Sequence, residues 1–106
     1  VLMKVESIAV DKEHGRLIIA DAHHSQKNLK IYTLDGIFTD KIIGKGLFKY
    51  EPEGIAIYKM GPQAGYIIAT DQDRSGNQFY LFDRESLAYI KTFKGNIVRN
   101  TDGVAV

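Results

Sequence analysis

The chain has no cysteine and no tryptophan, and only two of its 106 residues are proline. Without cysteine, disulfide bonds and metal sites built from thiolates are excluded. No apolar run approaches the roughly 20 residues that a membrane-spanning helix needs. Fourteen Lys and Arg residues nearly balance thirteen Asp and Glu residues, so the net charge of +1 indicates neither nucleic acid nor a membrane surface as a partner.

The chain also lacks the 3.6-residue apolar periodicity of an amphipathic helix. It has instead six Tyr, five Phe and ten Gly, with the glycines spread among short apolar segments. This mixture is typical of β-strands joined by turns. The first four expected strands are joined by short loops, which predicts one antiparallel meander. They are residues 5–10, 17–20, 28–33 and 37–43.

The same pattern then recurs further along the chain. Residues 66–69 match residues 17–20 at an offset of 49, and residues 81–83 match residues 31–33 at an offset of 50. A third copy begins at residues 101–106. A repeat of this length is typical of β-propellers, whose blades are four-stranded meanders. The expected strands of the second unit are residues 53–58, 66–69, 79–82 and 89–93.

The repeat therefore predicts an all-β chain that forms part of a β-propeller. One blade would span residues 5–44, a second residues 51–95, and residues 101–106 would start a third. A single meander cannot bury both of its faces, whereas about 4 to 8 blades stacked around an axis can do so. The expected partners are the remaining blades of a longer chain, or further copies of the chain that close the ring by oligomerisation.

Each copy of the repeat carries an acid just before the apolar run of its first strand. These acids are Glu6, Glu53 and Asp102, spaced 47 and 49 residues apart, and Glu51 lies close to the second. The first strands of propeller blades line the central channel, so the carboxylates would converge at one end of it. Clustered carboxylates raise one another's pKa unless a cation neutralises them, and oxygen ligands favour calcium over zinc. The alternative is that these acids only hydrogen-bond backbone amides between blades.

Four segments in register resemble the β-propeller phytases. They match that family's acid-x-Glu-Gly strand, its GYLIA-like strand, its aromatic strand ending in Asp-Arg and its Thr-Asp-Gly strand. In this chain they are residues 51–58, 65–70, 77–84 and 101–104. The resemblance is close over residues 51–106 and looser over residues 5–50. It implies a six-bladed propeller, of which this chain would form later blades.

The resemblance implies a calcium-dependent phosphomonoesterase that hydrolyses phytate (myo-inositol hexakisphosphate), with a metal-bound water attacking phosphorus. It places Glu6 and Glu53 at catalytic positions, and it implies a secreted or periplasmic enzyme. The chain departs from the family pattern where Ser7 follows Glu6 and where Ala22 follows Asp21. No substrate-binding Lys or Arg is carried over. The implied calcium ligands are Glu6, Asp21, Glu51, Glu53 and Asp102.

Two other functions stay open beside the phytase. A lactonase or gluconolactonase-type propeller also places acids at the starts of inner strands, but it predicts a single metal ion and Asn ligands. An NHL-like propeller, which only binds partners, predicts no response to metals at all.

The remaining polar and aromatic groups have simpler interpretations. Residues 71–77 are expected to form an inter-strand loop rather than a calcium loop, because the closing Glu of an EF-hand is missing. The histidines are interpreted as loop residues: His14, His23 and His24. The lysines are interpreted as part of a solvated connection: Lys41, Lys45 and Lys49. The aromatic residues are interpreted as packing residues: Tyr80, Phe82, Tyr89 and Phe93.

Overall fold

Eight strands arranged as two four-stranded sheets make up the part of the chain that the computed structural model describes, residues 4–71 and 77–95. These residues contain no helix, and none of them forms a segment able to cross a membrane as a helix. The expected all-β class is confirmed, and the strands begin and end within about two residues of the expected positions. The strands are β1 (Val5–Asp11), β2 (Arg16–Asp21), β3 (Asn28–Thr33), β4 (Phe38–Ile43), β5 (Pro52–Lys59), β6 (Gly65–Asp71), β7 (Asn77–Asp83) and β8 (Tyr89–Gly95).

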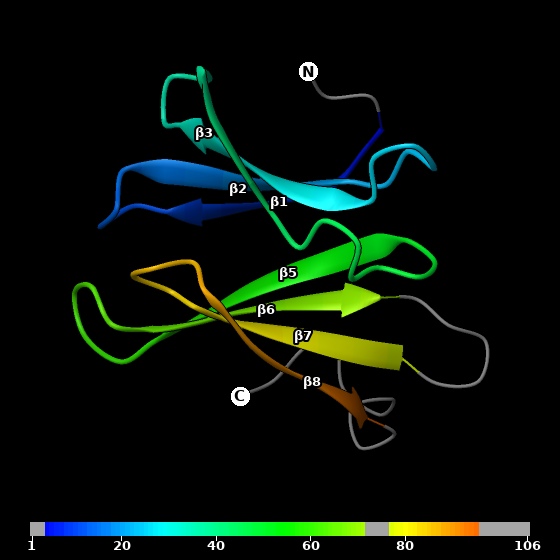
Figure 1. Cartoon of the computed structure of the whole chain (residues 1–106). Coiled ribbons are helices and arrows are strands. Elements are labelled where there is room, and N and C mark those ends of the chain that lie inside the picture. The colour runs from blue at the N-terminus through cyan, green and yellow to red at the C-terminus, as the bar shows by residue number, and fades with distance from the viewer. Residues whose placement is uncertain (1–3, 72–76, 96–106) are drawn as a thin grey trace.

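Both sheets are antiparallel meanders in which each strand pairs with the next one along the chain. Figure 1 shows one sheet above the other, with β1 and β5 adjacent in the middle. Between the sheets, β1 and β2 are the strands that contact β5. The sheets therefore meet mainly along their first strands.

The pairing registers show that the sequence-based alignment of the two units is wrong by one residue in their second strands. Asp21 pairs with the start of β1, and Asp71 pairs with the start of β5. Ile19 pairs with Lys30, and Ala69 pairs in the same way with Tyr80. The offset is thus 50 in β2 and β6, not 49. It rises from 47 in the first strands because residues 59–65 separate the paired residues of β5 and β6 where residues 12–15 separate the equivalent pair of β1 and β2.

The corrected offset matters because a shift of one residue moves a side chain to the other face of a sheet. Residues on one face of the first sheet pack against the second sheet and share one buried core with it. The counterparts of the second sheet's core residues lie on the opposite face of the first sheet. The sheets therefore stack front to back, as successive copies of one unit. The shared core comprises Ile18, Ala20, Leu29, Ile31, Ile43, Phe48, Ile67, Ala69, Tyr80, Phe82 and Leu87.

On the back face of the first sheet, Ile19, Lys30 and Tyr32 are buried, but the part that β1 contributes has no such cover in the described structure. Ile55 and Ile57 of β5 are partly buried against the shared core. Their counterparts in β1, at an offset of 47, are Ile8 and Val10, and each of these is 56% exposed. The first sheet thus covers Ile55 and Ile57 of the second sheet, whereas the equivalent residues of the first sheet, Ile8 and Val10, are exposed.

Gly65→Ala is expected to lower the free energy of unfolding by about 2–4 kcal/mol, from backbone strain and overpacking. Gly65 begins β6 with φ +138°, and an added Cβ would lie 2.0 Å from the carbonyl oxygen of Tyr58. Gly15→Ala is the matched control, because Gly15 also has a positive φ, +64°, but nothing lies within 4 Å of its added Cβ. Urea unfolding of both variants checks this: equal losses would show that the φ angle alone matters.

Candidate functional site

Glu6 and Glu53 occupy the same structural position in the two sheets. The pairing of β1 with β2 skips one residue at Glu6, and the pairing of β5 with β6 skips one at Glu53. Each glutamate is therefore the extra residue of a β-bulge. Bulges redirect a side chain and are common beside active sites. Glu6 is exposed and Glu53 is half-buried, so both carboxylates are accessible to solvent.

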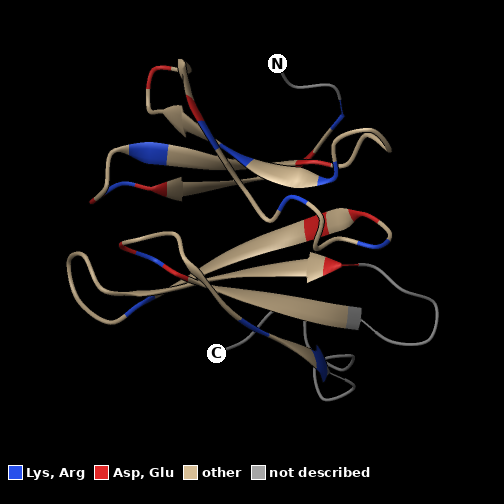
Figure 2. Ribbon diagram, viewed as in Figure 1, with Lys and Arg blue, Asp and Glu red and all other residues tan. Residues whose placement is uncertain are grey.

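An ion pair joins the segments that lead into these two bulges. The Lys4 ammonium lies 3.6 Å from Oε1 of Glu51, and the two side chains are 53% and 39% exposed. Such an exposed pair contributes little to stability, because water screens it. It does show that β1 and β5 begin at the same end of the molecule. Figure 2 shows acidic and basic segments side by side at that end.

Asp21 lies beneath this end and is fully buried as the last residue of β2. Its Oδ1 accepts hydrogen bonds from the backbone N–H of Lys4 at 3.0 Å and of His23 at 3.2 Å. Its Oδ2 lies 2.8 Å from the ammonium of Lys30, which is itself only 2% exposed. A metal ion could reach Asp21 only by displacing this ammonium, so the geometry gives Asp21 a supporting role.

Asp71 has the same place at the end of β6, although the sequence pattern assigned it to a loop. It is fully buried, and its oxygens accept hydrogen bonds from the backbone N–H groups of Lys49, Tyr50 and Glu51 at 2.8 to 3.2 Å. The hydroxyl of Tyr80 lies 2.9 Å from Oδ2. Burial, and then the hydrogen bond to this carboxylate, raise the pKa of Tyr80. The signal that could have identified Asp71 is its offset of 50 from Asp21.

The three histidines lie at two ends of the sheets, and within the described residues no group of three acids or histidines forms around them. His23 and His24 lie in the β2–β3 loop with ring centroids 4.3 Å apart, and Nδ1 of His23 lies 2.7 Å from the hydroxyl of Ser25. His14 is at the other end of the sheets, where its Nε2 lies 2.8 Å from the carbonyl oxygen of Gln63.

A second ionic cluster joins the two sheets at the end opposite to Glu6 and Glu53. Arg84, just after β7, is fully buried, and its Nη2 donates to Asp11 at 2.9 Å and to Glu13 at 2.7 Å. Its Nη1 donates to the carbonyl oxygens of Gly61 and Ala64 at 3.0 and 2.9 Å. We interpret this cluster as structural, because Arg84 and Asp11 are both fully buried.

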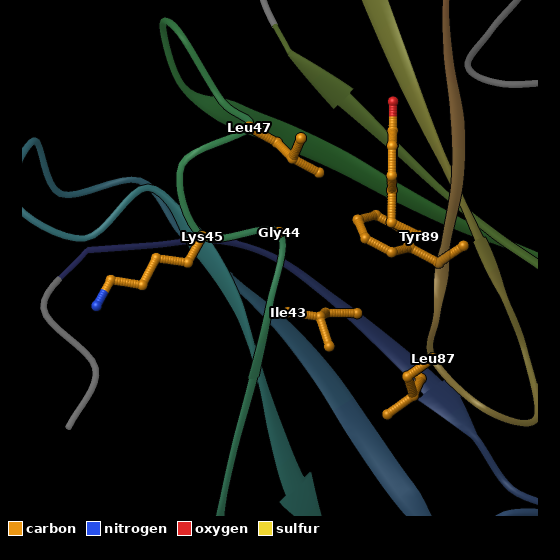
Figure 3. A pocket seen from close by; sticks show the side chains of 7 residues that line it. Ile43, Gly44, Lys45, Leu47, Leu87 and Tyr89 are labelled. Atoms are coloured by element: carbon orange, nitrogen blue, oxygen red, sulfur yellow. The ribbon is translucent and has the colours of Figure 1, made fainter.

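A pocket of about 320 Å³ lies between the β4–β5 connection and the start of β8, and Figure 3 shows it from close by. Tyr89 lines it, is 48% exposed, and packs edge-on against Phe82 with the ring centroids 6.0 Å apart. The ammonium of Lys45 points away from the other lining residues in Figure 3. None of the predicted site residues lines this pocket. Its lining residues are Ile43, Gly44, Lys45, Leu47, Phe82, Leu87 and Tyr89.

The structure thus brings Glu6, Glu51 and Glu53 to one end, while Asp102 lies outside the described residues. Within residues 4–71 and 77–95, no three acids or histidines converge closely enough to hold a metal ion as their side chains stand. Asn28, paired with Asp21, has a buried amide oxygen with no hydrogen-bond partner. Compared with protein-family models, curated proteins and solved structures, the chain gave no match.

Proposed function

We propose that the chain is part of a β-propeller that binds calcium and hydrolyses phosphomonoesters of the phytate type. The observation that carries this proposal is the matched pair of bulges that present Glu6 and Glu53 from two contacting strands, β1 and β5. Two carboxylates on equivalent, stiff positions at one end of the sheets suit a cation site that serves a polyanionic substrate.

The front-to-back stacking of the sheets supports the propeller part of the proposal. Stacking of this kind can continue in both directions, because the front face of one sheet packs against the back face of the next. Each sheet therefore keeps one face for a further neighbour. The β1 part of the back face of the first sheet, where Ile8 and Val10 are each 56% exposed, is then the surface that a preceding blade would cover. That blade would come from a longer chain or, in an oligomeric ring, from another copy.

The donor set fits calcium. Glu6, Glu51 and Glu53 offer accessible carboxylate oxygens, and the chain has no thiol. These are the hard oxygen ligands that calcium prefers. When bound, calcium would offset the charge of a phosphomonoester dianion and so lower the barrier to attack at phosphorus.

The chain's own residues would orient the reactants and move a proton. Glu6 and Glu53 would fix the attacking water and accept its proton as its oxygen bonds to phosphorus. The ester oxygen would leave with the alcohol and take up a proton from solvent. The Lys4 ammonium lies 3.6 Å from Glu51. Asp21 and Asp71 would hold the backbone of the segments that carry the glutamates.

We expect phosphate release from phytate to require calcium and to fall at least about 100-fold in kcat/KM in Glu53→Gln, because the change removes a charged ligand and keeps the shape of the side chain. Glu85→Gln, an exposed glutamate in the β7–β8 turn, is the matched control and is expected to stay within twofold of the wild type. Phosphate is measured with added calcium and with a chelator. Release that resists the chelator, or equal rates in the two variants, would refute the proposal.

The amide oxygen of Asn28 favours a second candidate, a lactonase-type propeller with one metal ion and Asn among its ligands. Asn28 is 3% exposed and sits directly across from Asp21 in the sheet. Proton release from a simple lactone, followed at constant pH with added divalent metal, tests it. Lactone hydrolysis without phosphate release would replace the first candidate by the second.

A further inference from the structure

The contact between the two sheets has a counterpart on their outer sides, because the sheets are equivalent units stacked front to back. Side chains alternate between the two faces of a strand, so Ala9 of β1 faces the second sheet, whereas Ile8 and Val10 face away from it. Ala9 packs against the shared core. Its equivalent in β5, at an offset of 47, is Ala56, which lies on the outer side and is half-buried. The outer side of β5 thus offers a further sheet the same small residue that β1 offers to β5.

A buried ion pair marks the contact between the sheets, and apolar residues take its place on the outer sides. Asp11 and Arg84 are both fully buried, and Nη2 of Arg84 donates to Asp11 at 2.9 Å. The pairing registers make Tyr58 the equivalent of Asp11, and Leu34 the equivalent of Arg84. Tyr58 is 39% exposed and Leu34 is 49% exposed. A change at only one of the two positions would leave a charge buried without its partner, but both have changed together, so the two outer sides match.

Charge distinguishes the ways in which these outer sides could meet. Lys4 and Glu51 are equivalent at the offset of 47, and the Lys4 ammonium lies 3.6 Å from Oε1 of Glu51. Contact between the outer sides of two first sheets would bring Lys4 near Lys4, and contact between two second sheets would bring Glu51 near Glu51. Only the outer side of a second sheet against that of a first sheet puts opposite charges together again, which favours this arrangement.

From these matches we infer that copies of the chain associate head to tail, with β5 of one copy packing against β1 of the next. Tyr58 of one copy then lies against Leu34 of the next, and the exposed Ile8 and Val10 of that copy are covered as Ile55 and Ile57 are covered within the chain. The two surfaces of such a contact differ, so it repeats until a ring closes. A propeller of about 4 to 8 blades would then need two to four copies. The inference uses the propeller part of the proposed function and does not depend on calcium.

Sedimentation of the 106-residue chain over a range of concentrations tests the inference. The wild type is expected to reach two to four times the mass of one chain as its concentration rises. Leu34→Asp and Tyr58→Asp each place a carboxylate without a donor in the contact, so each is expected to weaken the association at least about tenfold. Ile90→Asp is the control, expected to change it less than about twofold. Ile90 is 42% exposed and lies in β8, at the edge of the second sheet opposite to β5.

A mixture of the two aspartate variants tests the head-to-tail arrangement itself. Leu34→Asp keeps its Tyr58 surface and Tyr58→Asp keeps its Leu34 surface, so an equal mixture is expected to form a dimer with one copy of each variant and to stop there. A wild type that stays monomeric overturns the inference, and this is the result if residues 101–106, which lie outside the described structure, cover β5. A mixture that stays monomeric while the wild type associates also overturns it. Calcium-dependent phosphate release is measured separately, so either proposal can fail without the other.

Discussion

Arg84→Met is expected to lower the free energy of unfolding by about 3–5 kcal/mol, the largest effect of any single change considered. Arg84 is fully buried and donates to two carboxylates, those of Asp11 and Glu13, and to two backbone carbonyls. Met fills a similar volume, so the loss reports the buried groups left without their donor rather than a cavity. Chemical unfolding at neutral pH measures it.

The partner and the control for this experiment lie in the same cluster. Asp11 is also fully buried, so Asp11→Asn combined with Arg84→Met is expected to cost at least 2 kcal/mol less than the sum of the single changes. Lys59 contacts Glu13 at 3.0 Å, but its side chain is 48% exposed, and Lys59→Met should change stability by no more than about 0.5 kcal/mol. Similar losses for the two Met variants would show that burial does not set the value of these contacts.

The strands could be predicted from the sequence because the signals for them are local. Short apolar runs bounded by glycine and polar turns specify where a strand begins and ends, and residues 28–33 were predicted with the bounds of β3. The repeat then predicted a second meander of the same kind. These signals depend on neighbours along the chain and need no knowledge of tertiary contacts.

The register between the units could not be predicted from residue similarity. Residues 66–69 resemble residues 17–20 in residue type, yet the connection between the paired residues is three residues longer in the second unit (59–65 against 12–15), and the pairing aligns Asp71 with Asp21 instead. The buried charges escaped prediction for a related reason. Nothing nearby in the sequence marks Lys30 and Arg84 as buried, because their partners, Asp21 and Asp11, are 9 and 73 residues away along the chain.

For the candidate site, the repeat correctly indicated that Glu6 and Glu53 are equivalent, and both are accessible to solvent in the structure. It could not indicate the bulges, which depend on the pairing of each first strand with its neighbour. Nor could it separate acids that face solvent from Asp21, whose oxygens meet an ammonium and two backbone N–H groups. Exposed acids and buried acids both stand next to apolar runs in the sequence, so only the fold distinguishes them.

Lys30→Met is expected to lower the free energy of unfolding by about 3–4 kcal/mol, because it removes the ammonium that balances the buried Asp21 carboxylate. The same unfolding experiment with Lys30→Tyr should give a loss of less than about 2 kcal/mol. In the second sheet a tyrosine at this position already meets an equivalent aspartate, Asp71, and is accommodated there. The comparison of the two variants thus tests whether a tyrosine hydroxyl can replace the Lys30 ammonium as the donor to Asp21.

The double change of Lys30 to Met and Asp21 to Asn separates charge from shape at this position. Without either charge, the desolvation cost of the pair disappears, and the double variant is expected to be more stable than Lys30→Met alone by at least about 1 kcal/mol. It should keep the backbone bonds of residues 4 and 23, since the Asn carbonyl oxygen can still accept them. A double variant less stable than both single variants would mean that the ammonium and the carboxylate act independently. The arrangement of Asp21 with Lys30 and that of Asp71 with Tyr80 would then have no common structural role.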